Sequence, residues 1–197
     1  MERRWNHNIH YHPVILDAVP PGTRRALDVG CGDGYLTRQL RERVPEVVGL
    51  DLHEPSLQMA ADDGASTGLG YLRGDVRRAP FAPGSFDLVA SVATLHHLDA
   101  RDGLRAMADL LRPGGVLAVV GLALGRLPHD IPREIAGGIA TRAIRLRRGF
   151  DEVTAPMCWP PPEDYAGMRR IAAEELPGAR FRRHLLWRYS LVWTKPG

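Results

Sequence analysis

The sequence lacks the features that mark secreted, disulfide-bonded and membrane-spanning proteins. Its two cysteines, Cys31 and Cys158, are too few for a disulfide framework, and their separation matches no zinc-site spacing. The N-terminus carries charge but no apolar run follows it, so it does not resemble a secretory signal. The longest apolar stretch, GGVLAVVGLALG, is too short and too rich in glycine to cross a bilayer. We therefore expect a reduced, cytoplasmic protein with no transmembrane segment.

Lysine is almost absent, although the chain is basic. Of 26 basic residues only Lys195 is a lysine, and 23 acidic residues leave a formal net charge of +3. Abundant arginine, alanine, glycine and proline are typical of GC-rich coding. The arginine pairs are dispersed along the chain, and no aromatic residues are interleaved with them as stacking platforms for bases. The composition therefore does not favour a nucleic-acid partner.

What is present is an alternation of apolar runs and amphipathic segments. A length of 197 residues with 44% hydrophobic residues fits a single domain with a full core. Continuous apolar strands between helices predict a parallel sheet covered on both faces. The terminal stretch ARFRRHLLWRYSLVWTK predicts an antiparallel edge hairpin, with Trp187, Tyr189 and Trp193 alternating on one face. We expect an α/β, doubly wound, mostly parallel seven-stranded sheet with an antiparallel C-terminal hairpin. The expected strands before the hairpin are 25–30, 47–52, 69–75, 86–92 and 115–124, and the expected helices are 34–44, 54–65, 99–111 and 132–148.

A glycine-rich turn follows the first expected strand. In LDVGCGDG, glycines 30, 32 and 34 permit positive φ and close approach of a ligand to the backbone. Asp51 ends the second strand, where a carboxylate can accept hydrogen bonds from a ribose diol. A dinucleotide fingerprint would need glycine at the position of Tyr35. The loop therefore indicates a nucleoside-containing cofactor other than a dinucleotide, with a nicotinamide oxidoreductase as the rival interpretation.

Five ordered segments, ALDVGCGDG, VVGLDL, LRGDV, FDLVASVATLHHL and LLRPGGVLAVV, resemble a class I S-adenosylmethionine-dependent methyltransferase over roughly residues 24–122. The resemblance implies that S-adenosylmethionine is the cofactor. Asp51 then matches the ribose carboxylate, Asp75 the acceptor from the adenine amino group, and Ser91 the position facing the methionine. The full set of implied cofactor-binding residues is Tyr11, Gly30, Cys31, Gly32, Asp51, Leu52, Asp75, Val76, Ser91 and Val92.

Two adjacent histidines are the candidates for catalysis. Methyl transfer from a sulfonium is an in-line displacement, so the protein mainly aligns the reacting atoms and excludes water. His96 and His97 follow the fourth strand, where either imidazole could take a proton from the acceptor. A purely structural role in the loop is the alternative. Adjacent side chains are expected to point apart and no cysteine completes a ligand set, so we expect no metal.

The ends of the core segment supply candidate substrate contacts. Pro13 predicts the first turn of a helix within an N-terminal lid or helix, residues 1–22. Residues 125–162 form an expected cap on the acceptor side, and the arginine-rich helix within it offers a surface for a pocket, a membrane or a homodimer. The candidate lid and substrate residues are Asn8, His10, Tyr11, His12, Met157 and Trp159.

The sequence thus predicts one domain over residues 1–197 that methylates a small-molecule acceptor on oxygen, nitrogen or carbon. The chain is too short for a separate RNA- or protein-recognition domain. An RNA or protein methyltransferase is the alternative within the enzyme class. A non-catalytic subunit that binds cofactor and a partner is the alternative outside it.

Overall fold

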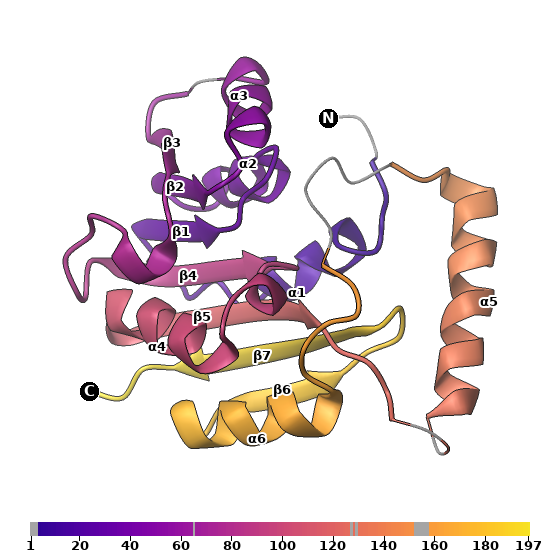
Figure 1. The fold of residues 1–197 in the computed structure, drawn as a ribbon. Coiled ribbons are helices and arrows are strands. Elements are labelled where there is room, and N and C mark those ends of the chain that lie inside the picture. Colours follow the sequence, from indigo (N-terminus) through magenta and orange to yellow (C-terminus); the bar gives the residue numbers. More distant parts are fainter. Residues whose placement is uncertain (1–3, 65, 127, 129, 152–157) are drawn as a thin grey trace.

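A computed structural model describes residues 4–64, 66–126, 128, 130–151 and 158–197, and its centre is a seven-stranded sheet. The strand order is β3-β2-β1-β4-β5-β7-β6 (Figure 1). The first five strands are parallel, whereas β7 pairs antiparallel with β5 and β6 antiparallel with β7. This confirms the expected fold class. The strands are β1 (Arg25–Val29), β2 (Glu46–Asp51), β3 (Leu69–Arg73), β4 (Phe86–Val92), β5 (Leu111–Leu122), β6 (Arg180–Arg183) and β7 (Arg188–Thr194).

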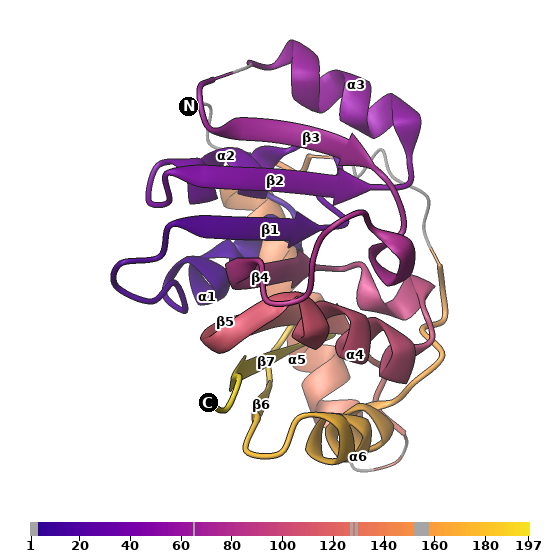
Figure 2. The ribbon, with the colours of Figure 1, turned by 90° about the vertical axis from the view of Figure 1, so that its left-hand side faces the viewer.

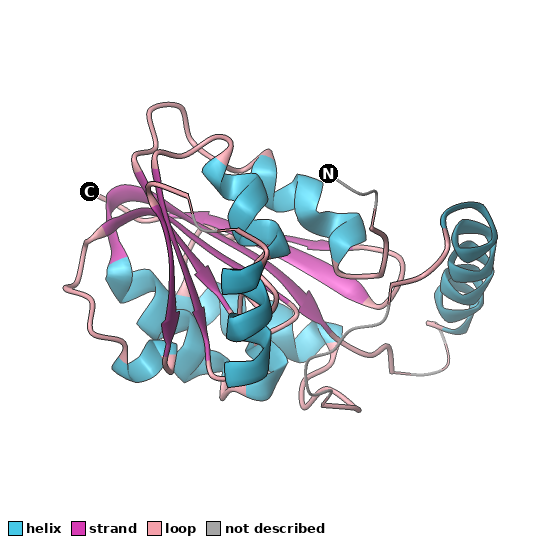
Figure 3. Ribbon diagram, turned by 90° about the horizontal axis from the view of Figure 1, so that it is seen from above, coloured by secondary structure: helices cyan, strands magenta, loops and turns pink. Residues whose placement is uncertain are grey.

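Helices cover both faces of this sheet, as Figure 3 shows from above. One helix, α6, was not predicted, although its N-terminus carries a capping signal in the sequence. The Asp164 side chain accepts a hydrogen bond from the Gly167 N–H, which satisfies one of the free backbone donors of the first turn. The helices are α1 (His12–Leu16), α2 (Tyr35–Arg41), α3 (Glu54–Asp62), α4 (Ala100–Leu110), α5 (Ile131–Arg148) and α6 (Tyr165–Glu175), with short 3₁₀ turns η1 (Ile9–Tyr11), η2 (Val76–Arg78) and η3 (Leu95–His97).

Two hydrophobic cores lie on opposite faces of the sheet. Successive strand side chains point to opposite faces, and along β5 Val116, Ala118 and Val120 join one core while Leu117 and Val119 join the other. The first core also contains the buried faces of α1 and α2, and the second those of α4 and α6. Both faces are therefore covered, which explains why the central strands are apolar at nearly every position.

The C-terminal hairpin differs from the expectation at its turn. Trp187 does not alternate with Tyr189 and Trp193 on one strand face, because β7 begins only at Arg188. Leu186 and Trp187 both have a φ of 57°, which places them in the tight turn between β6 and β7. Sequence alternation continued into this turn, so the pattern alone could not mark where the strand begins. Similarly, β5 begins at Leu111 and not at residue 115, because Leu111 already pairs with Phe86 before a bulge.

The parallel strands end at one edge of the sheet, and α5 stands beyond that edge (Figures 1 and 3). One side of α5 contacts the β6–β7 turn, where the Gly137 backbone lies against the Trp187 ring. Thr141 of α5 is hydrogen-bonded to His7 at 3.1 Å. Figure 2 shows the strands stacked from β3 to β6, with α3 covering the β3 edge. In the part of the chain that the structure describes, no helix is long and apolar enough to cross a membrane.

Candidate functional site

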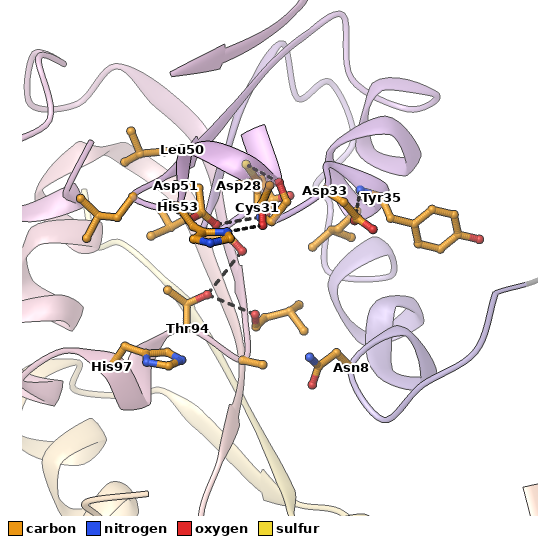
Figure 4. Close-up of a pocket in the computed structure, with 18 of the residues that line it drawn as sticks. Asn8, Asp28, Cys31, Asp33, Tyr35, Leu50, Asp51, His53, Thr94 and His97 are labelled. Carbon is orange, nitrogen blue, oxygen red and sulfur yellow. Dashed lines mark hydrogen bonds between the residues drawn. The ribbon is translucent and has the colours of Figure 1, made fainter. Parts of the chain in front are cut away.

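A cavity of about 810 Å³ opens at the carboxyl ends of β1, β2 and β4. The chain runs outward from β1 on one side and from β4 on the other, so this is the topological switch point where open α/β sheets bind ligands. Figure 4 shows Asp51, His53 and Cys31 on one side of the opening, with Thr94 and His97 across from them. The walls come from residues 4, 6–9, 12, 28–33, 35–36, 50–53, 56, 74–77, 92–94, 96–98, 122, 150 and 188.

Two glycines of the β1–α2 loop have different local requirements. Gly30 donates its N–H to the Leu50 carbonyl at 2.7 Å and has a φ of +74°. A Cβ at this position would lie 1.8 Å from Thr94 Oγ1, so the loop can meet the end of β4 only through glycine. Gly32 has a φ of +54°, and a Cβ there would meet no described atom within 4 Å. Gly30 is therefore required for packing, while Gly32 keeps the cavity open.

The Asp51 carboxylate is held at the end of β2 by two backbone donors. Its Oδ2 accepts the Gly32 N–H at 2.8 Å and its Oδ1 accepts the His53 N–H at 2.8 Å. Each carboxylate oxygen has two acceptor sites, so each retains one for a ligand hydroxyl. The two hydrogen bonds fix the plane of the carboxylate and tie the glycine loop to the second strand.

A second carboxyl group, that of Asp28, is buried beneath the same loop. Thr37 Oγ1 donates to Asp28 Oδ2 at 2.7 Å. Burial raises the pKa of Asp28 to about 7, and the Thr37 hydrogen bond only partly opposes this. Burial also raises the pKa of the neighbouring Cys31 thiol, which therefore stays protonated. Cys31 lines the cavity as a small apolar group.

Asp75 lies at the rim of the cavity and caps the turn η2. Its Oδ1 accepts the Arg77 N–H at 2.9 Å, and its Oδ2 pairs with the Arg77 guanidinium at 2.5 Å. The hydrogen bond from Arg77 lowers the pKa of Asp75, so this carboxyl is ionised. Val76 next to it is buried, while Leu52, which also lines the cavity, is 56% exposed.

At the end of β4, Ser91 does not lie where the sequence predicted, facing the ligand. Ser91 is buried, and its Oγ donates to the Val29 carbonyl at 3.0 Å, which joins β4 to β1. It is not among the cavity-lining residues, whereas Val92 and Thr94 are. Thr94 follows a sharp turn in which Ala93 has a φ of 54°. The backbone turn, which the sequence does not reveal, brings Thr94 to the cavity.

The two candidate catalytic histidines both line the cavity. The expectation that their side chains point apart is wrong, because the His96 and His97 ring centroids are 4.2 Å apart in η3. Burial lowers the pKa of His96 to about 4, with smaller contributions from His97 and Arg188. Burial also lowers the pKa of His97, although the negative charge of Asp51 opposes that shift. Both imidazoles are therefore neutral near pH 7. Because Asp51 opposes the effect of burial at His97, His97 is the more basic of the two.

The N-terminal segment lies along the cavity and then passes beneath it. Asn8 and His12 line the cavity, but His10 and Tyr11 do not. The Tyr11 hydroxyl donates to the Leu185 carbonyl at 2.7 Å, and its ring packs on His10 and His184. α1 begins at His12 with Pro13 in its first turn, as predicted. The segment therefore offers Asn8 and His12 to a ligand.

A reciprocal pair of hydrogen bonds joins this segment to the residues that follow α5. Trp5 is buried, its N–H donates to Asp151 Oδ2 at 2.5 Å, and its carbonyl accepts the Asp151 N–H at 2.9 Å. The Trp5 ring packs edge-on against Phe150, which lines the cavity. Two stretches separated by some 145 residues thus form one wall.

Within residues 125–162, the segment predicted to cap the acceptor side, Phe150 lines the cavity and Trp159 does not. The Trp159 side chain is 55% exposed and does not line the cavity, and Met157 lies outside the described residues. Sequence reasoning missed Phe150, Leu122 and Arg188. An arginine within the apolar terminal strand is the one signal that could have indicated Arg188. The described residues contain no group of three or more histidine, cysteine, aspartate or glutamate side chains able to hold a metal ion.

Comparison with known proteins matches this geometry to one family. A family model described as a methyltransferase domain matches residues 27–119. An uncharacterised methyltransferase of Mycobacterium tuberculosis is 38% identical over 200 residues, with the full length of both chains covered. A ubiquinone biosynthesis O-methyltransferase of Ralstonia nicotianae is 29% identical over 180 residues, covering 72% of this chain and 76% of the relative.

Solved structures show the same fold at lower identity. A phosphoethanolamine N-methyltransferase of Haemonchus contortus, solved with S-adenosyl-L-methionine, superimposes with a TM-score of 0.67 at 17% identity. The match covers 95% of this chain and 53% of that one. The overall architecture, from the parallel strands to the C-terminal hairpin, is therefore shared.

Substituting the two loop glycines should separate packing from ligand access. Gly30→Ala should lower the free energy of unfolding by about 3 kcal/mol, because a strained left-handed backbone adds to a clash with Thr94. Gly32→Ala should cost about 1–2 kcal/mol, the backbone strain alone. Urea unfolding of both variants measures this difference. Equal losses in the two proteins would contradict the assigned packing role of Gly30.

The buried His12 should make stability depend on pH. Burial lowers its pKa to about 4, below the ordinary 6.5, against the effect of its hydrogen bond to Gln39. The unfolded chain then takes up the proton first, so the contribution of His12 is complete above pH 6.5 and is lost between pH 6.5 and 4. At about 1.4 kcal/mol per pKa unit, the loss reaches about 3 kcal/mol.

The measurement is urea unfolding at pH 7 and pH 5. His12→Gln, which cannot take up a proton, should lose less stability than the wild type over this interval. Asp28→Asn is the control of opposite sign. The raised pKa of Asp28 stabilises the folded state as the pH falls toward 4, so removing this carboxyl should enlarge the loss. Identical pH dependence in all three proteins would refute both assignments.

Proposed function

Since this chain belongs to the class I S-adenosylmethionine-dependent methyltransferases, we propose that it transfers the cofactor's methyl group to a small-molecule acceptor. S-adenosylmethionine supplies a methyl group already activated on a sulfonium. The protein must then align the acceptor with that methyl and exclude water. The observation that carries the proposal is the cavity at the switch point, with Asp51 fixed at its β2 wall.

We assign the cofactor to the half of the cavity between β1 and η2. Asp51, with one acceptor site left on each oxygen, would bind the ribose hydroxyls. Leu52 and Val76 would enclose the adenine, with Asp75 accepting from its amino group at the rim. Gly30, Cys31, Gly32 and Val92 would face the methionine portion, and Ser91 would act from behind by fixing β4 to β1.

The other half of the cavity would receive the acceptor. Its walls are the N-terminal segment with Asn8 and His12, together with Leu122, Phe150 and Arg188. A volume of about 810 Å³ is in the range of small-ligand pockets. The Ralstonia relative, named for O-methylation in ubiquinone biosynthesis, also favours a small acceptor. His10 and Tyr11 would support the segment without touching the ligand.

Where the acceptor carries a proton, we assign its removal to His97. Figure 4 shows the His97 ring directed toward the open space that separates it from Asp51. The negative charge of Asp51 keeps the imidazole more basic than burial alone would allow. His96 is more deeply buried, with a pKa of about 4, and its Nδ1 has no hydrogen-bond partner in the described structure. His96 is therefore less suited to accept a proton, because it is weakly basic and no hydrogen bond to its Nδ1 fixes the orientation of its ring.

Removal of the Asp51 carboxylate should abolish tight cofactor binding. Calorimetric titration with S-adenosylmethionine and S-adenosylhomocysteine should give affinities at least about 50-fold weaker for Asp51→Ala, since two hydrogen bonds to a charged group are lost. Asp109→Ala, an exposed change on α4, should bind both ligands like the wild type. Full-strength binding by Asp51→Ala would disprove its role. Failure of the folded wild type to bind either ligand would disprove the proposed function.

His97→Gln should lower kcat by about 100-fold for an acceptor that must lose a proton. In the wild type, the rate should fall only as the pH drops below 6.5, because the pKa of His97 lies under that value. Methyl transfer from labelled cofactor to a panel of phenols and amines measures both effects. His96→Gln should keep this acid limb. An acid limb that persists unchanged in His97→Gln would assign the proton to another group.

A further inference from the structure

Arg188 is a buried cation in the acceptor half of the cavity. It begins β7, where it pairs with Leu122 of β5, and both residues line the cavity. Only 6% of its surface is exposed. The C-terminal strand therefore delivers a guanidinium to the interior of the site from the side opposite the cofactor loop.

The described structure offers Arg188 no carboxylate partner. Its Nη1 donates to the Leu186 carbonyl at 3.1 Å and to the Trp187 carbonyl at 3.5 Å, and its Nη2 donates to Asn8 Oδ1 at 2.6 Å. All three acceptors are uncharged. Its Nε is buried with no hydrogen-bond partner in the described part of the chain. The tyrosines near enough to act on its charge, Tyr11 and Tyr165, have hydroxyls whose pKa burial raises, so they carry no compensating charge.

The imidazoles around the cavity do not compensate the charge either. His7 and His96 lie close enough for Arg188 to lower the pKa of each, although burial is the larger cause, and both values are about 4. Neutral histidines leave the guanidinium as an isolated positive charge. Burying an unpaired charge is costly, and buried arginine is ordinarily paired with an anion. The other two arginines that line the cavity are each paired with a carboxylate, Arg4 with Asp33 at 2.7 Å and Arg77 with Asp75 at 2.5 Å.

We propose that Arg188 binds an oxyanion of the acceptor, a carboxylate or a phosphate, and so restricts the substrate to acidic small molecules with an apolar body. The inference rests on the proposed function and specifies its substrate class. A guanidinium matches the geometry of either oxyanion through two parallel N–H donors. Leu122, Phe150 and Ile9, which line the same cavity, provide apolar contacts for the rest of the molecule.

The anion bound by Arg188 is an anchor and not the methylated group. An ion pair with guanidinium draws electron density from the oxygens, which makes them poorer nucleophiles. The methylated atom is therefore a second group on the same acceptor, positioned by the anchor toward the cofactor half. This separates the role of Arg188, which binds, from that of His97, which accepts a proton.

The test compares acids with their own neutral amides on protein saturated with S-adenosylhomocysteine. Three pairs vary the apolar body: benzoate and benzamide, 3-phenylpropionate and its amide, and octanoate and octanamide. Phenyl phosphate is added to distinguish phosphate from carboxylate. Ligand-observed NMR titration should show at least one acid binding at least ten-fold more tightly than its amide, or phenyl phosphate binding at least ten-fold more tightly than benzamide. Equal binding of acid and amide in all pairs, with no binding of phenyl phosphate, would overturn the proposal.

Single substitutions show which side chain causes the preference for acids over amides. Arg188→Gln should abolish it, whereas Arg182→Gln, an exposed change on β6, should leave it intact. Asn8→Ala removes the hydrogen bond to Arg188 but keeps the charge, so the preference for acids should remain. If Asn8→Ala and Arg188→Gln lose the preference equally, Arg188 serves only to hold the N-terminal segment and the proposal is wrong.

Two further measurements distinguish a failure of this inference from a failure to fold and from a failure of the proposed function. If Arg188→Gln does not fold, Arg188→Lys replaces it, and loss of the two-donor geometry should reduce the preference several-fold. An undiminished preference in Arg188→Lys would count against bidentate binding by the guanidinium. Saturation with S-adenosylhomocysteine is measured beforehand by calorimetry. Its failure would disprove the proposed function, whereas its success with no preference for acids would disprove only the inference about Arg188.

Discussion

The contact between the end of β1 and the end of β4 is the constraint on which the site depends. Gly30 and Thr94 approach so closely there that no side chain fits on Gly30. Because the two strands lead the chain in opposite directions from this point, the cavity opens directly above the contact. Asp51 is then tied to the same loop through the Gly32 N–H. The alternating core residues beneath supply a rigid base, and the ligand-facing groups are placed by backbone geometry.

Burial of ionisable groups gives the site its electrostatic character. Asp28, His12 and His96 all have pKa values shifted toward the uncharged form, as expected when charge is removed from water without a partner. Arg188 cannot follow them, because a guanidinium remains protonated even with its pKa lowered to about 10. Of these four buried groups, only Arg188 therefore keeps its charge. Because Arg188 lies in the part of the cavity that we propose for the acceptor, its charge bears on the choice of acceptor and not on cofactor binding.

The sequence predicted the fold, and it identified the glycine loop and Asp51, which line the cavity, but it missed Phe150 and Arg188 on the cavity wall. Apolar strand runs, the glycine loop and Asp51 are local patterns, and each has one physical interpretation. The wall that contains Phe150, Leu122 and Arg188 depends on tertiary placement, because it brings together residues far apart in the sequence. The resemblance suggests Tyr11 as a lid residue, and the apolar segment before three prolines suggests Trp159. In the structure the Tyr11 hydroxyl bonds to the Leu185 carbonyl away from the cavity lining, and Trp159 is exposed. Arg188 was missed because its significance comes from the absence of a nearby carboxylate among the described residues, which only three-dimensional packing reveals.

The paired hydrogen bonds between Trp5 and Asp151 have a kinetic consequence. They join the N-terminal segment at Trp5 to the residues that follow α5, and Phe150 packs on the same indole. Displacing either stretch breaks two hydrogen bonds and uncovers a buried tryptophan, so the two stretches separate from the body together or not at all. Entry and exit past this wall then follow a single opening rate. A ligand that passed this wall would therefore meet one barrier, set by both stretches together.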